Sequence, residues 1–201
     1  MSALAAPARI GPNAVLQHIP VLDAMIGERL RNALLTRAGV AEPPADAGML
    51  PEDEVARLHY AVRLFLPDRA AEIQRAAGLG TGDYILAHRI PPAAQWLIRH
   101  VPAWAGARLL SAAIAKHSWT FAGSGKFRIL CHNPLTFEIA ANPLAVGGAD
   151  GPICDWHVAV FERLFGALVW PDVRVVEVAC AATGARACRF VFRPKGARAP
   201  Q

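Results

Sequence analysis

The chain has 201 residues, of which 54% are hydrophobic and 18% are charged, and this length suits one domain with a sizeable core. It contains no apolar run of about eighteen residues and no N-terminal signal-peptide pattern, so we expect a cytoplasmic protein with reduced cysteines. The formal net charge of +5 comes mostly from arginines spread singly along the chain, which indicates a solvated surface with a basic tail and argues against a nucleic-acid-binding protein.

The N-terminal quarter is predicted to be a helical segment behind a disordered end. Residues 1–12 are rich in Ala and Pro and are expected to be disordered. Residues 13–50 are expected to form a helical segment, because apolar residues recur there at three- and four-residue spacing. Pro20 should kink or divide this helix, and residues 41–50 are expected to form a loop.

The following stretch is also predicted to be helical. One helix is expected over residues 51–66, where three acidic residues favour its N-terminus, and another over 68–77. Three glycines are expected to break the latter helix: Gly78, Gly80 and Gly82. Further helical turns are expected over 81–88, followed by two short helices that open at prolines and contain Trp96 and Trp104.

The second half changes to a pattern of strands around one helix. Residues 126–132 and 136–140 alternate in polarity and are predicted to form a hairpin. Residues 154–170 have helical spacing, and residues 173–180 and 188–192 are predicted to be two more strands. Helices followed by strand–strand–helix–strand–strand indicate an α+β fold with a small antiparallel sheet covered by helices.

Three of the four cysteines fall in this last region together with a carboxylate. Cys180 and Cys188 bracket a glycine turn, and Cys154 opens the preceding helix, which is half of a tetrahedral zinc site in the making. The alternative is that they are small buried residues, because their spacing is not one of the standard zinc-finger patterns. Glu177 and Cys180 face opposite sides of an ideal strand, so the strand must end or bulge near Val178 if both are ligands.

The run Glu177-x-x-Cys180-x3-Gly184-x3-Cys188-x-Phe190 resembles the C-terminal signature of the 4-vinyl reductase domain family. That family includes ligand-sensing domains of aromatic-responsive transcriptional activators, and its fold resembles subunits of the TRAPP vesicle-tethering complex. The resemblance implies a domain over residues 51–193, followed by a basic tail over 194–201. It also implies a zinc site, whose ligands would be Cys154, Glu177, Cys180 and Cys188. Asp155 or His157 are the alternatives to Glu177. Three thiolates and a carboxylate would close the coordination shell, so the zinc is expected to be structural.

Two further segments, residues 82–91 and 116–125, resemble the stand-alone members of this family that belong to bacteriochlorophyll biosynthesis. Those members are named for reduction of the 8-vinyl group of divinyl protochlorophyllide. The resemblance covers roughly residues 50–193. It implies a vinyl-bearing magnesium tetrapyrrole as ligand, other enzymes of the pathway as partners, and a place at the periphery of the photosynthetic membrane.

The residues themselves favour binding over reduction. Reducing a vinyl group needs a nicotinamide, flavin or iron–sulfur cofactor, but the glycine cluster 78–82 follows a helix and is therefore not a dinucleotide-binding fingerprint. An iron–sulfur cluster usually needs four thiolates, and Cys131 is predicted to point into the hairpin core. We therefore predict a carrier or accessory protein. Reduction of the 8-vinyl group, and a sensor or interaction module, are the alternatives.

A tetrapyrrole needs an apolar slot, aromatic faces, an axial ligand and cations for its carboxylates. The candidates are the aromatic residues Trp96, Trp104, Trp119 and Phe121, the histidines His88, His100 and His117, and the cations Arg89, Arg99 and Lys116. His117 is the favoured axial ligand because it lies between Lys116 and Trp119, ahead of a glycine-rich turn. The alternative is that these histidines lie on the surface and the tryptophans in the core. The excess of apolar helix surface predicts a homodimer.

Overall fold

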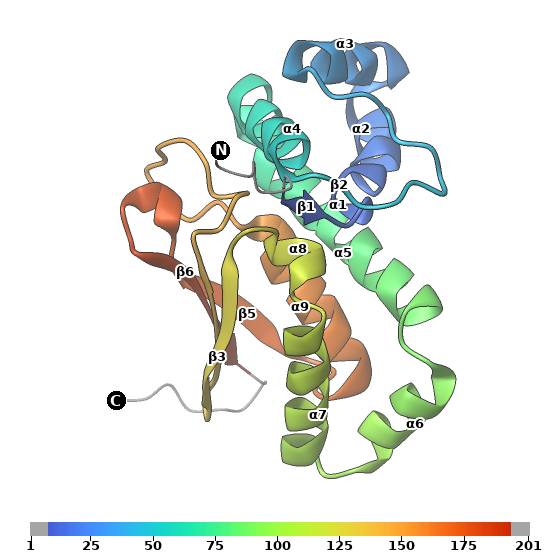
Figure 1. Ribbon diagram of the computed structural model, residues 1–201, viewed down its shortest axis with the longest axis vertical. Helices are drawn as coiled ribbons and strands as arrows, with labels where there is room; N and C mark the ends of the chain where they lie inside the picture. The colour runs from blue at the N-terminus through green and yellow to red at the C-terminus, as the bar shows by residue number, and fades with distance from the viewer. Residues whose placement is uncertain (1–7, 194–201) are drawn as a thin grey trace, which may run out of the picture.

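The computed structural model describes residues 8–193 (Figure 1). The N-terminal half is helical apart from two short paired strands, and contains β1 (Arg9–Ile10), α1 (Asn13–Leu16), α2 (His18–Ile26), α3 (Glu28–Ala38), β2 (Leu50–Pro51), α4 (Glu52–Phe65), the short 3-10 helix η1 (Pro67–Arg69) and α5 (Ala70–His88). The second half contains α6 (Pro92–His100), α7 (Ala103–Lys116), α8 (Trp119–Ala122), β3 (Lys126–His132), β4 (Leu135–Ala140), α9 (Asp155–Leu168), β5 (Arg174–Ala179), η2 (Ala181–Thr183) and β6 (Ala187–Arg193).

The predicted α+β class is confirmed. The last four strands form an antiparallel sheet in the order β3-β4-β6-β5, and helix α9 crosses one of its faces (Figure 1). Buried phenylalanines fill the space between this face and α9, because alternate residues of β4 and β6 point toward the helix. The ring of Phe137 lies 4.7 Å from that of Phe192 and 5.3 Å from that of Phe161, between centroids.

The register of the sheet also confirms the irregularity predicted near Val178. Strands β5 and β6 pair in regular register up to Glu177, opposite Phe190, and shift between Glu177 and Ala179. Such a bulge lets side chains on either side of it reach the same face of the sheet. Glu177 and Cys180 can therefore both turn toward the N-terminus of α9.

The prediction that three glycines break the helix at residue 77 is wrong, because α5 continues to His88. Glycine is tolerated inside a helix where another backbone must come close. A methyl group added at Gly78 would lie 2.5 Å from the carbonyl oxygen of Trp156, and one at Gly82 would lie 2.6 Å from Cβ of Arg163. The glycines therefore form the surface on which α9 lies against α5.

We expect Gly78→Ala to lower the free energy of unfolding by about 3 kcal/mol, as overpacking at a backbone contact does. Gly80→Ala in the same helix is the matched control, since its added methyl group would meet only the flexible end of Gln17. That change should stay within about 1 kcal/mol of the wild type. Urea unfolding of both variants checks the prediction, and equal effects would show that close packing is not what these glycines provide.

Two other expectations in the N-terminal region are corrected. Pro20 does not interrupt a helix, because it lies in the first turn of α2, where a backbone N–H has no intrahelical partner. The breaks fall instead at Gln17 and at Gly27, whose φ is 81°. Residues 9–10 are not disordered: they pair as β1 with β2. Residues 1–7 of the expected disordered end, and the basic tail over 194–201, lie outside the described residues.

Three buried histidines join the helical layer to α9. The rings of His18 and His59 lie 4.7 Å apart between centroids, and Nε2 of His18 lies 3.1 Å from Oε1 of Gln74. His157 is buried among aromatic rings, and its Nε2 has no hydrogen-bond partner. Burial lowers the pKa of His18 and of His157 to about 4, and it also lowers the pKa of His59. All three are therefore neutral in the folded protein at neutral pH.

This burial predicts acid destabilisation. The unfolded chain takes up protons below about pH 6.5, whereas the folded chain does so only near the lowered pKa values. The stabilisation is therefore complete above about pH 6.5 and is lost as the pH falls toward about 4, at about 1.4 kcal/mol per pH unit for each histidine. Replacing His157 with Phe should reduce the loss between about pH 7.5 and 5.5 by about 1 kcal/mol. Urea unfolding at the two pH values measures it, and an unchanged pH dependence would contradict it.

Candidate functional site

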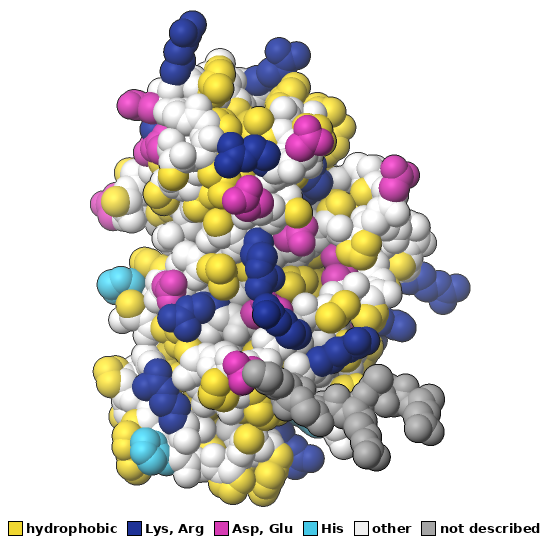
Figure 2. All heavy atoms as spheres, turned by 180° about the vertical axis from the view of Figure 1, so that it is seen from behind, with side chains coloured by type: hydrophobic (Ala, Val, Ile, Leu, Met, Phe, Trp, Pro, Cys, Tyr) yellow, Lys and Arg dark blue, Asp and Glu magenta, His cyan; other side chains and the backbone are white. Residues whose placement is uncertain are grey.

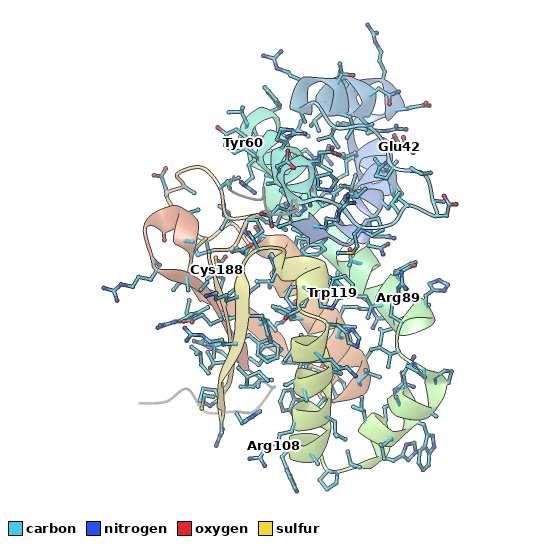
Figure 3. All side chains as sticks on the ribbon, in the orientation of Figure 1. Glu42, Tyr60, Arg89, Arg108, Trp119 and Cys188 are labelled. Carbon is cyan, nitrogen blue, oxygen red and sulfur yellow. The ribbon has the colours of Figure 1, made fainter. Side chains whose placement is uncertain are left out.

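Four side chains from three elements converge where α9 begins, and their ligand atoms lie within 4.8 Å of one another. Cys154 is the residue that caps α9. Glu177 comes from β5, Cys180 follows the end of that strand, and Cys188 comes from β6. All four are buried, and Figure 3 shows Cys188 inside the junction between the sheet and the helices. The sequence prediction of this set of four neighbours is confirmed in its geometry.

The spacing of this cluster fits a metal ion. Sγ of Cys154 lies 3.5 Å from Sγ of Cys188, close to the separation of about 3.8 Å that two sulfurs 2.3 Å from a tetrahedral zinc would have. Oε2 of Glu177 accepts a hydrogen bond of 2.9 Å from the backbone N–H of Cys154. Its other oxygen, Oε1, is buried without a hydrogen-bond partner. A buried carboxylate oxygen is left unsatisfied at high cost, and a metal ion would satisfy it.

Neighbouring groups orient the sulfurs as outer partners of a metal site do. Nδ2 of Asn142 lies 3.4 Å from Sγ of Cys154 and 3.5 Å from Sγ of Cys188. The backbone N–H of Ala181 donates to Sγ of Cys188 over 3.4 Å. These donors favour thiolate over thiol, which is the form that binds metal.

The electrostatics of the cluster favour one shared negative charge when no metal is bound. Contact with the thiols of Cys154 and Cys188 lowers the pKa of Cys180, while the neighbouring Cys180 raises the pKa of Cys154. Burial raises the pKa of Glu177 to about 7. A divalent cation would remove this competition, because it stabilises all the deprotonated groups together.

The other residues considered for this site lie elsewhere. Asp155 and His157 are not among the four converging ligands; the ring of His157 packs instead 5.9 Å from that of Phe190, between centroids. Cys131 is exposed near the end of β3, so the prediction that it points into the hairpin core is wrong. Its strand shifts register between Ile129 and Cys131, which breaks the alternation on which that prediction depended.

A second feature is an apolar cavity of about 590 Å³ on the opposite side of α9 from the sheet. Its walls come from α5, α7, α8 and α9 and from the two segments around residues 11–14 and 47–49. Trp156, Val160 and Leu164 recur every fourth residue on α9 and form one wall, while Phe121 links this wall to the phenylalanine core. The volume lies within the range of small-molecule and cofactor sites.

A few polar groups stand among the apolar residues of the cavity. His117, which ends α7, and Arg89, which ends α5, both contribute to its lining. Nη2 of Arg89 donates to the hydroxyl of Tyr84 over 3.3 Å, and the guanidinium lies 5.5 Å from the ring centroid of that residue. Figure 3 shows Arg89 and Trp119 on facing elements, α5 and α8. An apolar slot with a cation and an imidazole suits a flat apolar ligand that carries a carboxylate.

The structure brings together only part of the predicted ligand set. His117, Trp119, Phe121 and Arg89 line the cavity. The other predicted residues do not, and are His88, Lys116, Trp96, Trp104, His100 and Arg99. Trp96 stacks on the ring of His100 at 4.3 Å between centroids. The sequence analysis missed Tyr84 and Trp156 as lining residues, although the four-residue spacing of Trp156, Val160 and Leu164 was the signal for a shared helix face.

Comparison with known proteins defines the class of this fold and site. Residues 135–194, which hold all four converging ligands, match the 4-vinyl reductase domain. Among solved structures, a mutant of T. tengcongensis H-NOX has a TM-score of 0.58 at 13% identity, over 93% of this chain and 98% of that one. The phenol-responsive sensory domain of the transcription activator PoxR has a TM-score of 0.54 at 14% identity, over 83% and 90%. The chain thus carries a 4-vinyl reductase domain and has an H-NOX-like fold.

Two relatives match almost the whole chain. The bacteriochlorophyll synthase 23 kDa chain of Cereibacter sphaeroides is 59% identical over 189 residues, covering 94% of this chain and 92% of the relative. The protein of the same name from Rhodobacter capsulatus is 53% identical over 188 residues, covering 94% and 88%. The chain belongs to the family of the bacteriochlorophyll synthase 23 kDa chain.

Proposed function

We propose that this protein works in bacteriochlorophyll biosynthesis by binding a vinyl-bearing magnesium tetrapyrrole, of the divinyl protochlorophyllide type, in the cavity beside α9. It acts as a carrier or accessory that passes the pigment to other enzymes of the pathway. The observation that carries the proposal is the cavity itself: an apolar slot of about 590 Å³ with one imidazole and one guanidinium in its lining. The names of the two relatives support the pathway.

His117 is the axial ligand in this proposal. It is the histidine in the cavity lining, and its position at the end of α7 leaves the ring exposed to an entering ligand. Neutral imidazole is a common metal ligand in proteins. Arg89 would meet a carboxylate of the pigment, and the ring of Trp119 would cover the macrocycle.

The four-ligand cluster is proposed to hold zinc in a structural role. Thiolate-rich sites of four ligands suit zinc, and a closed shell leaves no position for a substrate. Cys154 caps α9, and the wall of the cavity begins on the same helix at Trp156. The metal would therefore fix the helix against the hairpin β5–β6 and keep the cavity open.

Reduction of the 8-vinyl group is the alternative activity, and one experiment separates the two. The purified protein is mixed with divinyl protochlorophyllide, the absorption spectrum is recorded, and the pigment is analysed by mass spectrometry after addition of NADPH or dithionite. We expect a shifted Soret band and unchanged pigment mass. A gain of two hydrogens in the pigment would establish the reductase instead.

The axial ligand is tested in the same assay. We expect His117→Ala to change the bound spectrum and to weaken binding about tenfold or more, as loss of a metal ligand does. His88→Ala is the matched control, because His88 is an exposed histidine outside the cavity lining. Equal spectra and affinities for the two variants would remove His117 from this role.

A further inference from the structure

The hairpin formed by α6 and α7 carries large apolar side chains on its surface. Trp96 is 61% exposed, Leu97 is 47% exposed and Trp104 is 66% exposed. None of the three lines the cavity. Figure 2 shows hydrophobic side chains gathered at the lower end of the molecule, the end where Figure 1 draws α6 and its connection to α7. Surface apolar residues that gather in this way mark a binding surface.

The hairpin holds these side chains in a fixed arrangement. Its two helices pack closely, since a methyl group at Gly106 would lie 2.8 Å from the carbonyl oxygen of Ile98. Trp96 stacks on His100, and the guanidinium of Arg108 lies 5.7 Å from the ring centroid of Trp104. The exposed tryptophans therefore belong to a packed element, each with a cationic or imidazole neighbour.

The charge of this region has one sign. From residue 84 to residue 137 the chain contains no Asp or Glu, while six basic residues fall in the same stretch: Arg89, Arg99, Arg108, Lys116, Lys126 and Arg128. Acidic residues occur throughout the rest of the described chain, so the absence is local. A surface with cations and without carboxylates is complementary to an anionic partner.

We propose that the hairpin patch, consisting of Trp96, Leu97, Trp104, Arg99 and Arg108, binds the surface of an anionic lipid bilayer. Tryptophan at the water–lipid boundary and arginine beside it are the combination that interfacial helices use. Each cation near an anionic leaflet adds attraction. The proposed contact is peripheral and is made through the surface of the hairpin. No helix of residues 8–193 is long and apolar enough to cross a bilayer.

A second copy of the chain is the less favoured occupant of the patch. A twofold-symmetric interface places each patch against itself. Arg99 and Arg108 would then face their own copies with no carboxylate from the surrounding stretch to separate them, which is unfavourable. A membrane supplies the missing negative charge.

Vesicle binding of the purified full chain, without pigment, tests the proposal independently of tetrapyrrole binding. We expect co-sedimentation with vesicles of phosphatidylglycerol and phosphatidylcholine in equal amounts, and binding about tenfold weaker to phosphatidylcholine alone. Trp96→Ala with Trp104→Ala, and separately Arg99→Glu with Arg108→Glu, should each weaken binding to the anionic vesicles about tenfold or more. Circular dichroism checks that the variants are folded.

The matched control is Arg29→Glu with Leu30→Ala, an exposed basic and apolar pair on α3, at the other end of the molecule (Figure 1). It should bind the anionic vesicles like the wild type. Absence of wild-type binding, or equal loss in the control and the hairpin variants, would overturn the proposal. So would a dimer, seen by sizing, that dissociates on Trp96→Ala with Trp104→Ala, because the patch would then be a protein interface.

Discussion

Loss of the metal is expected to unfold most of the protein. Structural zinc contributes about 10–16 kcal/mol of binding free energy in small zinc domains, and a domain of this size is stable by only about 5–15 kcal/mol. The cluster joins the start of α9 to β5 and β6, so its loss frees the helix that supports both the core and the cavity. We expect one zinc per chain in the purified protein and a loss of about 5 kcal/mol or more in Cys188→Ser.

The comparison variant for this prediction is Cys131→Ser, because Cys131 is the exposed cysteine outside the cluster. It should keep the full zinc content and the wild-type urea midpoint. Asn142→Ala, which removes the side chain that contacts two of the sulfurs, should weaken zinc affinity about 10- to 100-fold without abolishing it. Full stability of Cys188→Ser without zinc would refute the structural role.

Filling the cavity is expected to abolish pigment binding while leaving the fold intact. Ala113 contributes to the cavity lining and is exposed, so a large side chain there enters the slot without disturbing the core. We expect Ala113→Trp to weaken binding of divinyl protochlorophyllide about 100-fold or more, since the blocked slot cannot bury the macrocycle. Titration followed by the Soret band measures the affinity.

The neighbouring residue supplies the control. Ala112 is exposed on the same helix and does not line the cavity, so Ala112→Trp adds the same side chain outside the slot. It should bind pigment like the wild type, and both variants should keep the wild-type melting temperature. If Ala113→Trp binds as tightly as Ala112→Trp, the pigment does not occupy this cavity.

The metal cluster was predictable because its ligands follow from local chemistry and parity. Thiols and a carboxylate around a glycine turn indicated a metal site, and the parity of Glu177 and Cys180 required the bulge that β5 contains. The cavity was not predictable in this way, because it is built from six separate segments of the chain. Sequence spacing identified the α9 wall and His117, but not which of the other candidates would face them.

The errors have a common physical cause. Gly78 and Gly82 were interpreted as helix breakers, although glycine in a helix also serves close packing, and only the approach of α9 distinguishes the two uses. Trp96 and Trp104 are exposed instead of lying in the core or lining the cavity. Local sequence therefore predicted the elements well, whereas the use of each helix face depended on tertiary neighbours.

The central claim is that one tetrapyrrole occupies the cavity beside α9, and tryptophan fluorescence tests it most directly. Trp119 and Trp156 both line the cavity, so a bound pigment would quench their emission by energy transfer. We predict that titration of the zinc-loaded protein with divinyl protochlorophyllide gives saturable quenching that ends at one pigment per chain, together with the Soret shift. Quenching that rises linearly without saturation, at unchanged Soret position, would contradict the account.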